Sequence, residues 1–228
     1  MTLKESMHAA ELAEADTHTQ TSDFLDLLVD AQTEASLARL VSRLPRNVVI
    51  GLAGPKGSGK SSIAEALHTG AAPHVRRLRF ADGLKRMLLS LGLTSEQIDG
   101  PDKHKACELL DYSTPRHAMQ TLGAEWGRGM ISPNLWVNAC MQQIDNTAST
   151  RVHVIDDVRF ANEADAIHKR GGVVIEVVQP GVLYNPEHAS EAGLPKSLID
   201  YSVMNDNTPL SAAIHVMLRT LHKIGASK

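Results

Sequence analysis

One stretch constrains the fold of this chain more than any other: residues 48–62, which read VVIGLAGPKGSGKSS. An apolar run enters a glycine-rich loop, the loop ends in Gly-Lys-Ser, and a helical pattern follows. Gly54 to Ser61 fits the phosphate-binding pattern G-x-x-x-x-G-K-[S/T] in full. Gly57 and Gly59 can adopt backbone angles that other residues resist, so that successive N–H groups turn inward around an anion. The helix that opens after the loop adds the positive end of its dipole at the same point.

This motif predicts a site for a nucleoside triphosphate and Mg²⁺. Lys60 would reach the β- and γ-phosphates, and the Ser61 hydroxyl would ligate the metal. A chance match of a glycine-rich turn is the alternative, and the order of strand, loop and helix argues against it. We assign the triphosphate to Gly54, Lys56, Gly57, Ser58, Gly59, Lys60, Ser61 and Ser62.

Composition narrows the class of protein. The chain has 228 residues, enough for one α/β domain with a full core. Hydrophobic residues make up 43% of it and charged residues 21%, a composition typical of a soluble globular protein. The net charge of -3 offers no bulk basic field for long nucleic acid. We find no membrane span or signal peptide, and expect a cytoplasmic protein in which Cys107 and Cys140 are buried free thiols.

Residues 1–45 precede the first strand and are expected to form an N-terminal helical extension of a domain over residues 46–228. Residues 1–20 have little apolar content and are expected to be a frayed helix or disordered. A helix is predicted from Ser22 to Leu44, before Pro45. We favour a helix packed on the flank of the domain over a contact in a homodimer. Its apolar stripe comprises Phe24, Leu27, Leu28, Ala31, Ala35, Ala38 and Val41 and, less regularly, Leu40 and Leu44.

Strands and helices alternate along the rest of the chain. This alternation predicts a three-layer α/β fold, with a five-stranded parallel sheet and helices on both faces. The predicted strands cover residues 48–53, 75–80, 152–155, 172–178 and 201–204, and the main helices cover 61–68, 84–91, 135–144 and 209–224.

Acidic residues follow two of these strands, at the sheet edge where ligands bind in such folds. Asp156 and Asp157 end the strand 152–155, where a carboxylate holds Mg²⁺ directly or through water. Arg159 follows; it would neutralise charge on a transferred phosphoryl group, or form a salt bridge to Asp156. Asp82 and Lys85 follow the strand 75–80, and Asp82 has the alternative role of N-cap for the helix 84–91.

Residues 116–128 suggest a binding site for a second phosphate group. Arg116 and Gln120 are four apart and share one helix face, where a guanidinium and an amide suit a phosphate and a base edge. Arg128 would turn back toward the same pocket, although a solvent-facing helix is the alternative. The polar stretch 179–198 is expected to be a lid, in which the lone His188 is interpreted as a structural hydrogen bonder.

Together these motifs resemble the deoxynucleoside monophosphate kinases of tailed bacteriophages, enzymes with the P-loop nucleoside monophosphate kinase fold. The resemblance covers roughly residues 47–224. It rests on Gly54–Ser61 and on blocks reading FADGLK at 80–85, QTLGAEWGR at 120–128, DVRFANE at 157–163 and HASE at 188–191.

The resemblance implies transfer of the γ-phosphoryl group of ATP to the 5′-phosphate of a deoxynucleoside monophosphate, with Mg²⁺ as cofactor. It implies a helical acceptor-binding region over about 83–130, and Asn205 and Asp206 near the adenine. The implied catalytic residues are Lys60, Arg159, Asp157 and Asp82, and the metal residues are Ser61, Asp157 and Asp156. The implied acceptor residues are Asp82, Lys85, Arg116, Gln120, Glu125, Trp126, Arg128 and Arg159.

Two alternatives stay open at this stage. A P-loop kinase for another phosphorylated small molecule, such as phosphomevalonate or dephospho-coenzyme A, would use the same phosphate-clamping parts. A switch GTPase or motor ATPase is less favoured, because the chain lacks an N-K-x-D guanine-reading motif.

The stretch 179–198 contains no arginine, so the catalytic cations would come mainly from Lys60, Arg159 and the 116–128 region. No residue pattern identifies the base.

Overall fold

The structure is a computed structural model that describes residues 33–147, 150–184 and 193–225. Within these residues the chain forms the predicted sheet of five parallel strands, in the order β2-β3-β1-β4-β5. The central strand pairs with both neighbours, since Gly51 is in register with Ile155 and with Val174. The strands are β1 (Val48–Ala53), β2 (Val75–Leu78), β3 (Val152–Ile155), β4 (Val173–Val178) and β5 (Tyr201–Met204).

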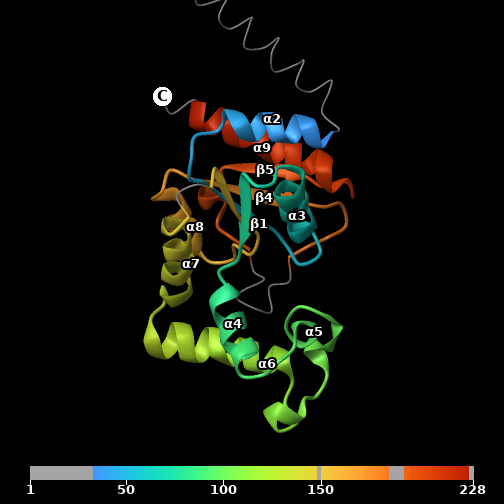
Figure 1. Cartoon of the computed structure of the whole chain (residues 1–228), viewed down its shortest axis with the longest axis vertical. Helices are drawn as coiled ribbons and strands as arrows, with labels where there is room; N and C mark the ends of the chain where they lie inside the picture. The colour runs from blue at the N-terminus through green and yellow to red at the C-terminus, as the bar shows by residue number, and fades with distance from the viewer. Residues whose placement is uncertain (1–32, 148–149, 185–192, 226–228) are drawn as a thin grey trace, which may run out of the picture.

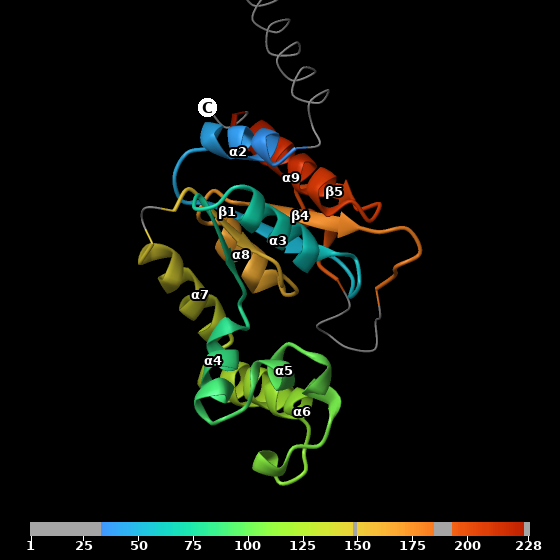
Figure 2. The same cartoon turned by 45° about the vertical axis from the view of Figure 1, so that its right-hand side comes forward.

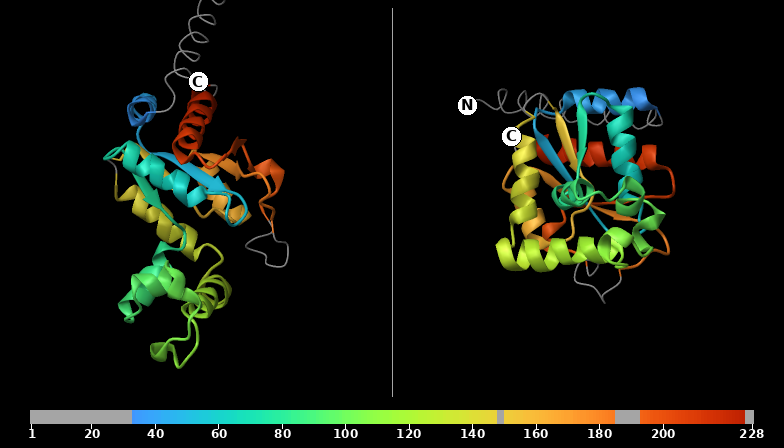
Figure 3. Two further views of the ribbon diagram at one scale, coloured as in Figure 1. Left: turned by 90° about the vertical axis from the view of Figure 1, so that its right-hand side faces the viewer. Right: turned by 60° about the horizontal axis from the view of Figure 1, so that its bottom comes forward.

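Helices cover both faces of this sheet, as the alternation predicted (Figures 1 and 3). One face packs against α2 (Glu34–Arg43), α3 (Lys60–Gly70) and α9 (Pro209–Gly225). The other packs against α7 (Leu135–Asp145) and α8 (Ala161–His168). Alternate strand residues therefore enter different cores, and β1 is buried along its whole length. The three-layer α/β fold is confirmed.

Helix α2 lies on the flank of the domain, beside α9 and α3 (Figure 1). It begins after Thr33, whose hydroxyl accepts a hydrogen bond from the Ser36 N–H, and it ends before Pro45. Its buried apolar residues are Leu37, Leu40 and Val41, whereas Ala35 is exposed. The predicted stripe was therefore wrong for Ala35, whereas Ala38 is half-buried; the longer side chains bury more apolar area. The predicted start at Ser22 lies outside the described residues, as do Phe24, Leu27, Leu28 and Ala31.

A helical lobe follows β2 and has its own small core (Figure 2). It contains α4 (Asp82–Ser90), α5 (Ser95–Ile98), α6 (Pro115–Gln120) and η3 (Thr121–Ile131), with the short 3₁₀ turns η1 (Pro101–His104) and η2 (Glu108–Leu110). The lobe occupies the region expected to bind the acceptor, at the end of the sheet where β2 finishes. Cys107 lies in its core and Cys140 under the sheet; both are buried free thiols, as predicted.

The helix after α6 is wider than an α-helix, because η3 is an eleven-residue π-helix. Trp136 of α7 packs against it and donates a hydrogen bond from Nε1 to the Gly123 carbonyl oxygen at 2.8 Å. A Cβ atom on Gly127 would lie 2.5 Å from the indole ring, so only glycine permits this approach. Long π-helical stretches are uncommon and occur often at functional sites.

A short 3₁₀ turn, η5 (Lys196–Leu198), precedes β5. Among the described residues, the structure has no helix both long enough and apolar enough to cross a membrane.

Candidate active site

The phosphate-loop residues connect β1 to α3, at the carboxyl edge of the sheet. Gly59 has a φ of 88° and precedes the first residue of the helix, Lys60. The Lys60 ammonium donates to the carbonyl oxygens of Gly54 at 2.8 Å and Pro55 at 2.7 Å, and to Ser58 Oγ at 3.3 Å. The loop thus surrounds the ammonium group of Lys60, which belongs to the loop's own motif. A bound phosphate would offer this ammonium an oppositely charged partner in the same place.

The other loop residues differ in exposure. Ser58 is fully buried, whereas Lys56, Ser61 and Ser62 are exposed. The Ser61 hydroxyl lies in the first turn of α3, where the helix N–H groups have no intrahelical acceptors. Negative charge is favoured at this position.

The two acids after β3 lie on opposite faces of the sheet. Val154 belongs to the core on the α3 face and Ile155 to the core on the α8 face, so strand alternation places Asp156 toward α3 and Asp157 away from it. Arg77 confirms the first placement, because its guanidinium bonds both Asp156 and Glu65 of α3.

Asp156 is 3% exposed and pairs with Arg77, with Nε and Oδ2 3.1 Å apart. Its other oxygen, Oδ1, is buried and has no hydrogen-bond partner among the described residues. The salt bridge that the sequence suggested between Arg159 and Asp156 is therefore replaced by one to Arg77.

Asp157 has both oxygens engaged by backbone amides at the exit of β2. Oδ1 accepts from the Phe80 N–H at 2.8 Å, and Oδ2 accepts from the Ala81 N–H at 3.0 Å. Burial, together with the nearby Glu163 carboxylate, raises the pKa of Asp157 to about 7, although the two amides favour its ionised form. Asp157 thus fastens the start of the helical lobe to β3, a role that its position after an apolar strand did not reveal.

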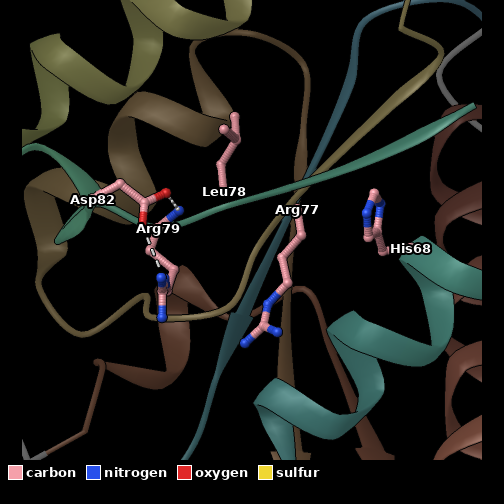
Figure 4. A pocket seen from close by; sticks show the side chains of 5 residues that line it. All are labelled: His68, Arg77, Leu78, Arg79 and Asp82. Atoms are coloured by element: carbon pink, nitrogen blue, oxygen red, sulfur yellow. Dashed lines mark hydrogen bonds and ion pairs between the residues drawn. The ribbon is translucent and has the colours of Figure 1, made fainter. Parts of the chain in front are cut away.

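A cavity of about 260 Å³ lies beside the end of β2, on the α3 face (Figure 4). Arg77 of β2 and Arg79, which directly follows the strand, both line it, and the sequence pattern had given neither a role in the site. The cavity is lined by His68, Arg77, Leu78, Arg79 and Asp82.

Asp82 is the first residue of α4, and its carboxylate accepts from the Arg79 N–H and from Arg79 Nε, both at 2.8 Å. The alternative role of Asp82 as a helix N-cap is wrong, because Ala81 takes the cap position. Arg79 also bonds Asp99 at 3.1 Å, and Lys85 pairs with the same carboxylate. These charged groups join the end of β2 to the lobe.

Most of the predicted acceptor residues lie on α6 and η3. Arg116 is half-buried, and Gln120, Glu125 and Trp126 are exposed. In the part of the chain that the structure describes, the side chains of Arg116, Gln120 and Glu125 form no hydrogen bond or ion pair. Trp126 lies 6.3 Å from Trp136, measured between ring centroids.

The Arg128 side chain pairs with Glu163 of α8. Its NH2 donates to Glu163 Oε1 at 2.5 Å, and its guanidinium lies 4.2 Å from the centroid of the Phe160 ring. Glu163 also accepts from the Arg159 N–H at 2.7 Å and the Phe160 N–H at 3.0 Å. The Arg159 backbone is therefore fixed, while its half-buried side chain forms no hydrogen bond or ion pair with any described residue.

Asn205 and Asp206, which follow β5, differ in exposure and in hydrogen-bond partners. Asn205 is 3% exposed and its Nδ2 donates to the Ser58 carbonyl oxygen at 2.9 Å. Asp206 is exposed and accepts from the Thr208 N–H at 3.2 Å, at the start of α9. The side chain of Asn205 thus contacts the phosphate loop.

The expected lid is described only at its ends, since His188, Ser190 and Glu191 lie outside the described residues. On either side of the gap, Tyr184 Oη and Lys196 Nζ donate to Glu176 of β4, at 2.9 and 2.7 Å.

Comparisons with known proteins show which proteins the chain resembles. A family model described as deoxynucleotide monophosphate kinase matches residues 102–212. A putative deoxynucleotide monophosphate kinase of Acanthamoeba polyphaga mimivirus is 32% identical over 179 residues, which cover 69% of this chain and 86% of the relative.

Two phage proteins match over shorter stretches. The deoxynucleoside-5′-monophosphate kinase of Escherichia phage T5 is 27% identical over 120 residues, covering 50% of this chain and 47% of that protein. The deoxynucleotide monophosphate kinase of Enterobacteria phage T4 is 31% identical over 100 residues, covering 43% of this chain and 42% of that protein. These alignments span less than half of either phage protein. The match to the mimivirus protein, however, covers most of its length, and the chain belongs to the deoxynucleotide monophosphate kinase family.

Proposed function

We propose that this protein transfers the γ-phosphoryl group of ATP to the 5′-phosphate of a deoxynucleoside monophosphate, with Mg²⁺, and releases the deoxynucleoside diphosphate and ADP. One observation carries the proposal: the phosphate loop after β1 and the helical lobe after β2 meet at the same edge of one parallel sheet. Family membership favours this acceptor over phosphomevalonate or dephospho-coenzyme A, and favours transfer over a switch or motor function.

The donor half of the site is the loop Gly54–Ser61 with the first turn of α3. Its N–H groups would bind the β- and γ-phosphates of ATP, and Lys60 would exchange its loop carbonyl partners for phosphate oxygens. Asp206 would border the base, at the exit of β5.

The residues present suit Mg²⁺, which prefers hard oxygen ligands. The Ser61 hydroxyl lies in the first turn of α3. Asp156 directs its carboxylate to the same face, and one of its buried oxygens has no partner in the part of the chain that the structure describes. We therefore assign the metal to Ser61 and Asp156, in preference to Asp157, whose oxygens both accept backbone amides. When bound, Mg²⁺ would neutralise charge on the β- and γ-phosphates.

The acceptor half combines the lobe with the cationic end of β2. Arg116 would bind the acceptor's phosphate, and Gln120 would bind its base edge, with Glu125 and Trp126 nearby. Asp82 and Lys85 would border the nucleotide, beside Arg79. Arg128 would contribute by holding the lobe against α8 through Glu163.

In the reaction, an oxygen of the acceptor phosphate attacks the γ-phosphorus of ATP. The bond from that phosphorus to the β–γ bridging oxygen breaks, and ADP leaves with the electron pair. Lys60 and Arg159 would compensate the charge on the transferred group, which is where such a reaction gains most from fixed cations.

The decisive measurement is ADP release in a coupled assay with each of the four deoxynucleoside monophosphates. Hydrolysis without acceptor and a Lys60→Ala variant, shown to be folded by circular dichroism, are the controls. We expect acceptor-dependent turnover that Lys60→Ala abolishes. Arg116→Ala should raise the KM of the acceptor and leave the KM of ATP unchanged. No acceptor-dependent turnover with any of the four nucleotides would refute the proposed function.

A further inference from the structure

The side chain of Asn205 forms a bridge inside the protein. It follows β5, is almost fully buried, and uses both ends of its amide on backbone groups. Nδ2 donates to the Ser58 carbonyl oxygen at 2.9 Å, and Oδ1 accepts from the Asn207 N–H at 3.2 Å. The amide thus ties the turn after the last strand to the loop after the first strand.

This contact determines the orientation of one peptide in the phosphate loop. In a trans peptide the carbonyl and the N–H point in opposite directions. Because Asn205 holds the Ser58 carbonyl, the N–H of the next residue, Gly59, must point away from Asn205. This N–H donates none of the backbone hydrogen bonds found among the described residues. An N–H group fixed in this way is ready to bind an anion.

The packing around Gly59 supports a dedicated contact. A Cβ atom at this position would lie 2.0 Å from Asn205 Nδ2, and the backbone has a φ of +88°. Glycine is therefore required both by the left-handed backbone and by the close approach of the amide. The loop and the asparagine fit only as a pair.

We infer that Asn205 is a positioning residue for triphosphate binding, which orients the Ser58–Gly59 peptide toward the phosphates and acts through the loop. This role differs from the contact with adenine that the sequence suggested, because the nitrogen and the oxygen of the Asn205 amide each bond a backbone group of the protein. The inference rests on the proposed function only in requiring a triphosphate as ligand.

The test uses inorganic tripolyphosphate, a ligand with the phosphates of ATP and no base. Its Kd and that of ATP would be measured by calorimetry on the whole chain, for the wild type and for Asn205→Ala. A positioning role predicts that both ligands weaken by the same factor, about tenfold for one lost hydrogen bond to the loop. The KM of ATP should rise with it, while the KM of the acceptor stays unchanged.

Two further variants sharpen this result. Asn205→Asp, nearly identical in shape, should weaken both ligands more than alanine does, because a carboxylate would face the Ser58 carbonyl and add negative charge near the phosphates. Asn207→Gly is the matched control in the same turn: it removes an exposed amide, and glycine accepts the φ of 70° there. It should leave both Kd values within about twofold.

Each outcome decides the inference. Weaker ATP binding with unchanged tripolyphosphate binding would overturn it and restore a base contact, and unchanged binding of both would also overturn it. If Asn205→Ala fails to fold, Asn205→Ser, which fits the same buried space, replaces it in the comparison. Tripolyphosphate binding needs no acceptor, so failure of the proposed transfer reaction would leave this test intact.

Discussion

Arg128 and Glu163 form an ion pair that fastens the helical lobe to the sheet domain, with 2.5 Å between NH2 and Oε1. The two residues belong to different sequence motifs, one on η3 and the other on α8. Glu163 is 2% exposed, and its other partners within the described ranges are the N–H groups of Arg159 and Phe160. A single buried carboxylate thus holds both the lobe and the segment that carries the proposed catalytic arginine.

Arg128→Ala should therefore reduce stability strongly. The substitution leaves the buried Glu163 carboxylate without its cation, which typically lowers the free energy of unfolding by about 3–5 kcal/mol. The loss should be somewhat smaller here, because Arg128 is partly exposed. Urea unfolding would measure the loss. Arg86→Ala is the control, since the Arg86 side chain bonds only Gln143 among the described residues, at an exposed position, and the change in stability should be less than about 0.5 kcal/mol. Equal effects of the two variants would contradict the structural role of the pair.

The close contact of Gly127 with Trp136 gives a second prediction. Gly127→Ala would place a methyl group 2.5 Å from the indole, and overpacking of this kind costs about 1–3 kcal/mol. Gly129→Ala lies in the same π-helix but meets its nearest atom at 3.5 Å, an ordinary contact, so it should be neutral or slightly stabilising. Thermal unfolding of the pair isolates the steric effect. Similar melting temperatures for the two variants would show that the indole does not depend on this glycine.

The fold was predictable because its signals are local. Runs of β-branched residues indicate the buried strands, and the glycine pattern of residues 54–61 predicts the loop between strand and helix. The π-helix was not predictable in this way. Its contact with Trp136 is long-range, because the indole bonds the carbonyl of a residue thirteen positions earlier in the chain.

The site was predicted only in part, for a similar reason. The sequence placed Asp156 and Asp157 together at a strand end, but only the sheet shows that they face opposite layers and bind different partners. Arg128 was expected in the acceptor pocket because its motif carried no sign of Glu163, which lies 35 positions away. Long-range pairs of this kind are set by packing, and no spacing rule reveals them.

The assignment of the metal to Asp156 gives a third prediction. Asp156→Asn should raise the Mg²⁺ concentration needed for half-maximal rate by roughly 10- to 100-fold, as expected when a metal site loses a charged oxygen. Asp157→Asn should leave the Mg²⁺ dependence unchanged and lower stability, because one amide of Phe80 or Ala81 would lose its acceptor.

One control separates metal binding from the salt bridge of Asp156. Arg77→Met removes the same ion pair and retains the carboxylate. If Arg77→Met shifts the Mg²⁺ dependence as far as Asp156→Asn does, the effect comes from the ion pair. A shift confined to Asp157→Asn would instead assign the metal to Asp157 and contradict the assignment to Asp156.

His153 makes the stability of the fold depend on pH. Its ring is fully buried in β3, and neither nitrogen has a hydrogen-bond partner among the described residues. Burial, together with Arg76 and Arg170, lowers the pKa of His153 to about 4 from its usual value of 6.5. The folded state therefore resists protonation, and the free energy of unfolding should fall as the pH drops from 6.5 to about 4, by about 3 kcal/mol in total.

Replacing the ring isolates this contribution from other titrating groups. Asp157, whose pKa is raised to about 7, acts in the opposite direction, because the folded state favours its protonated form as the pH falls. His153→Val removes only the histidine and suits a buried strand. Urea unfolding at pH 7, 6, 5 and 4 should show the wild type losing about 3 kcal/mol more than this variant across the range. Parallel curves for the two proteins would mean that His153 is protonated in the folded state as readily as in the unfolded chain.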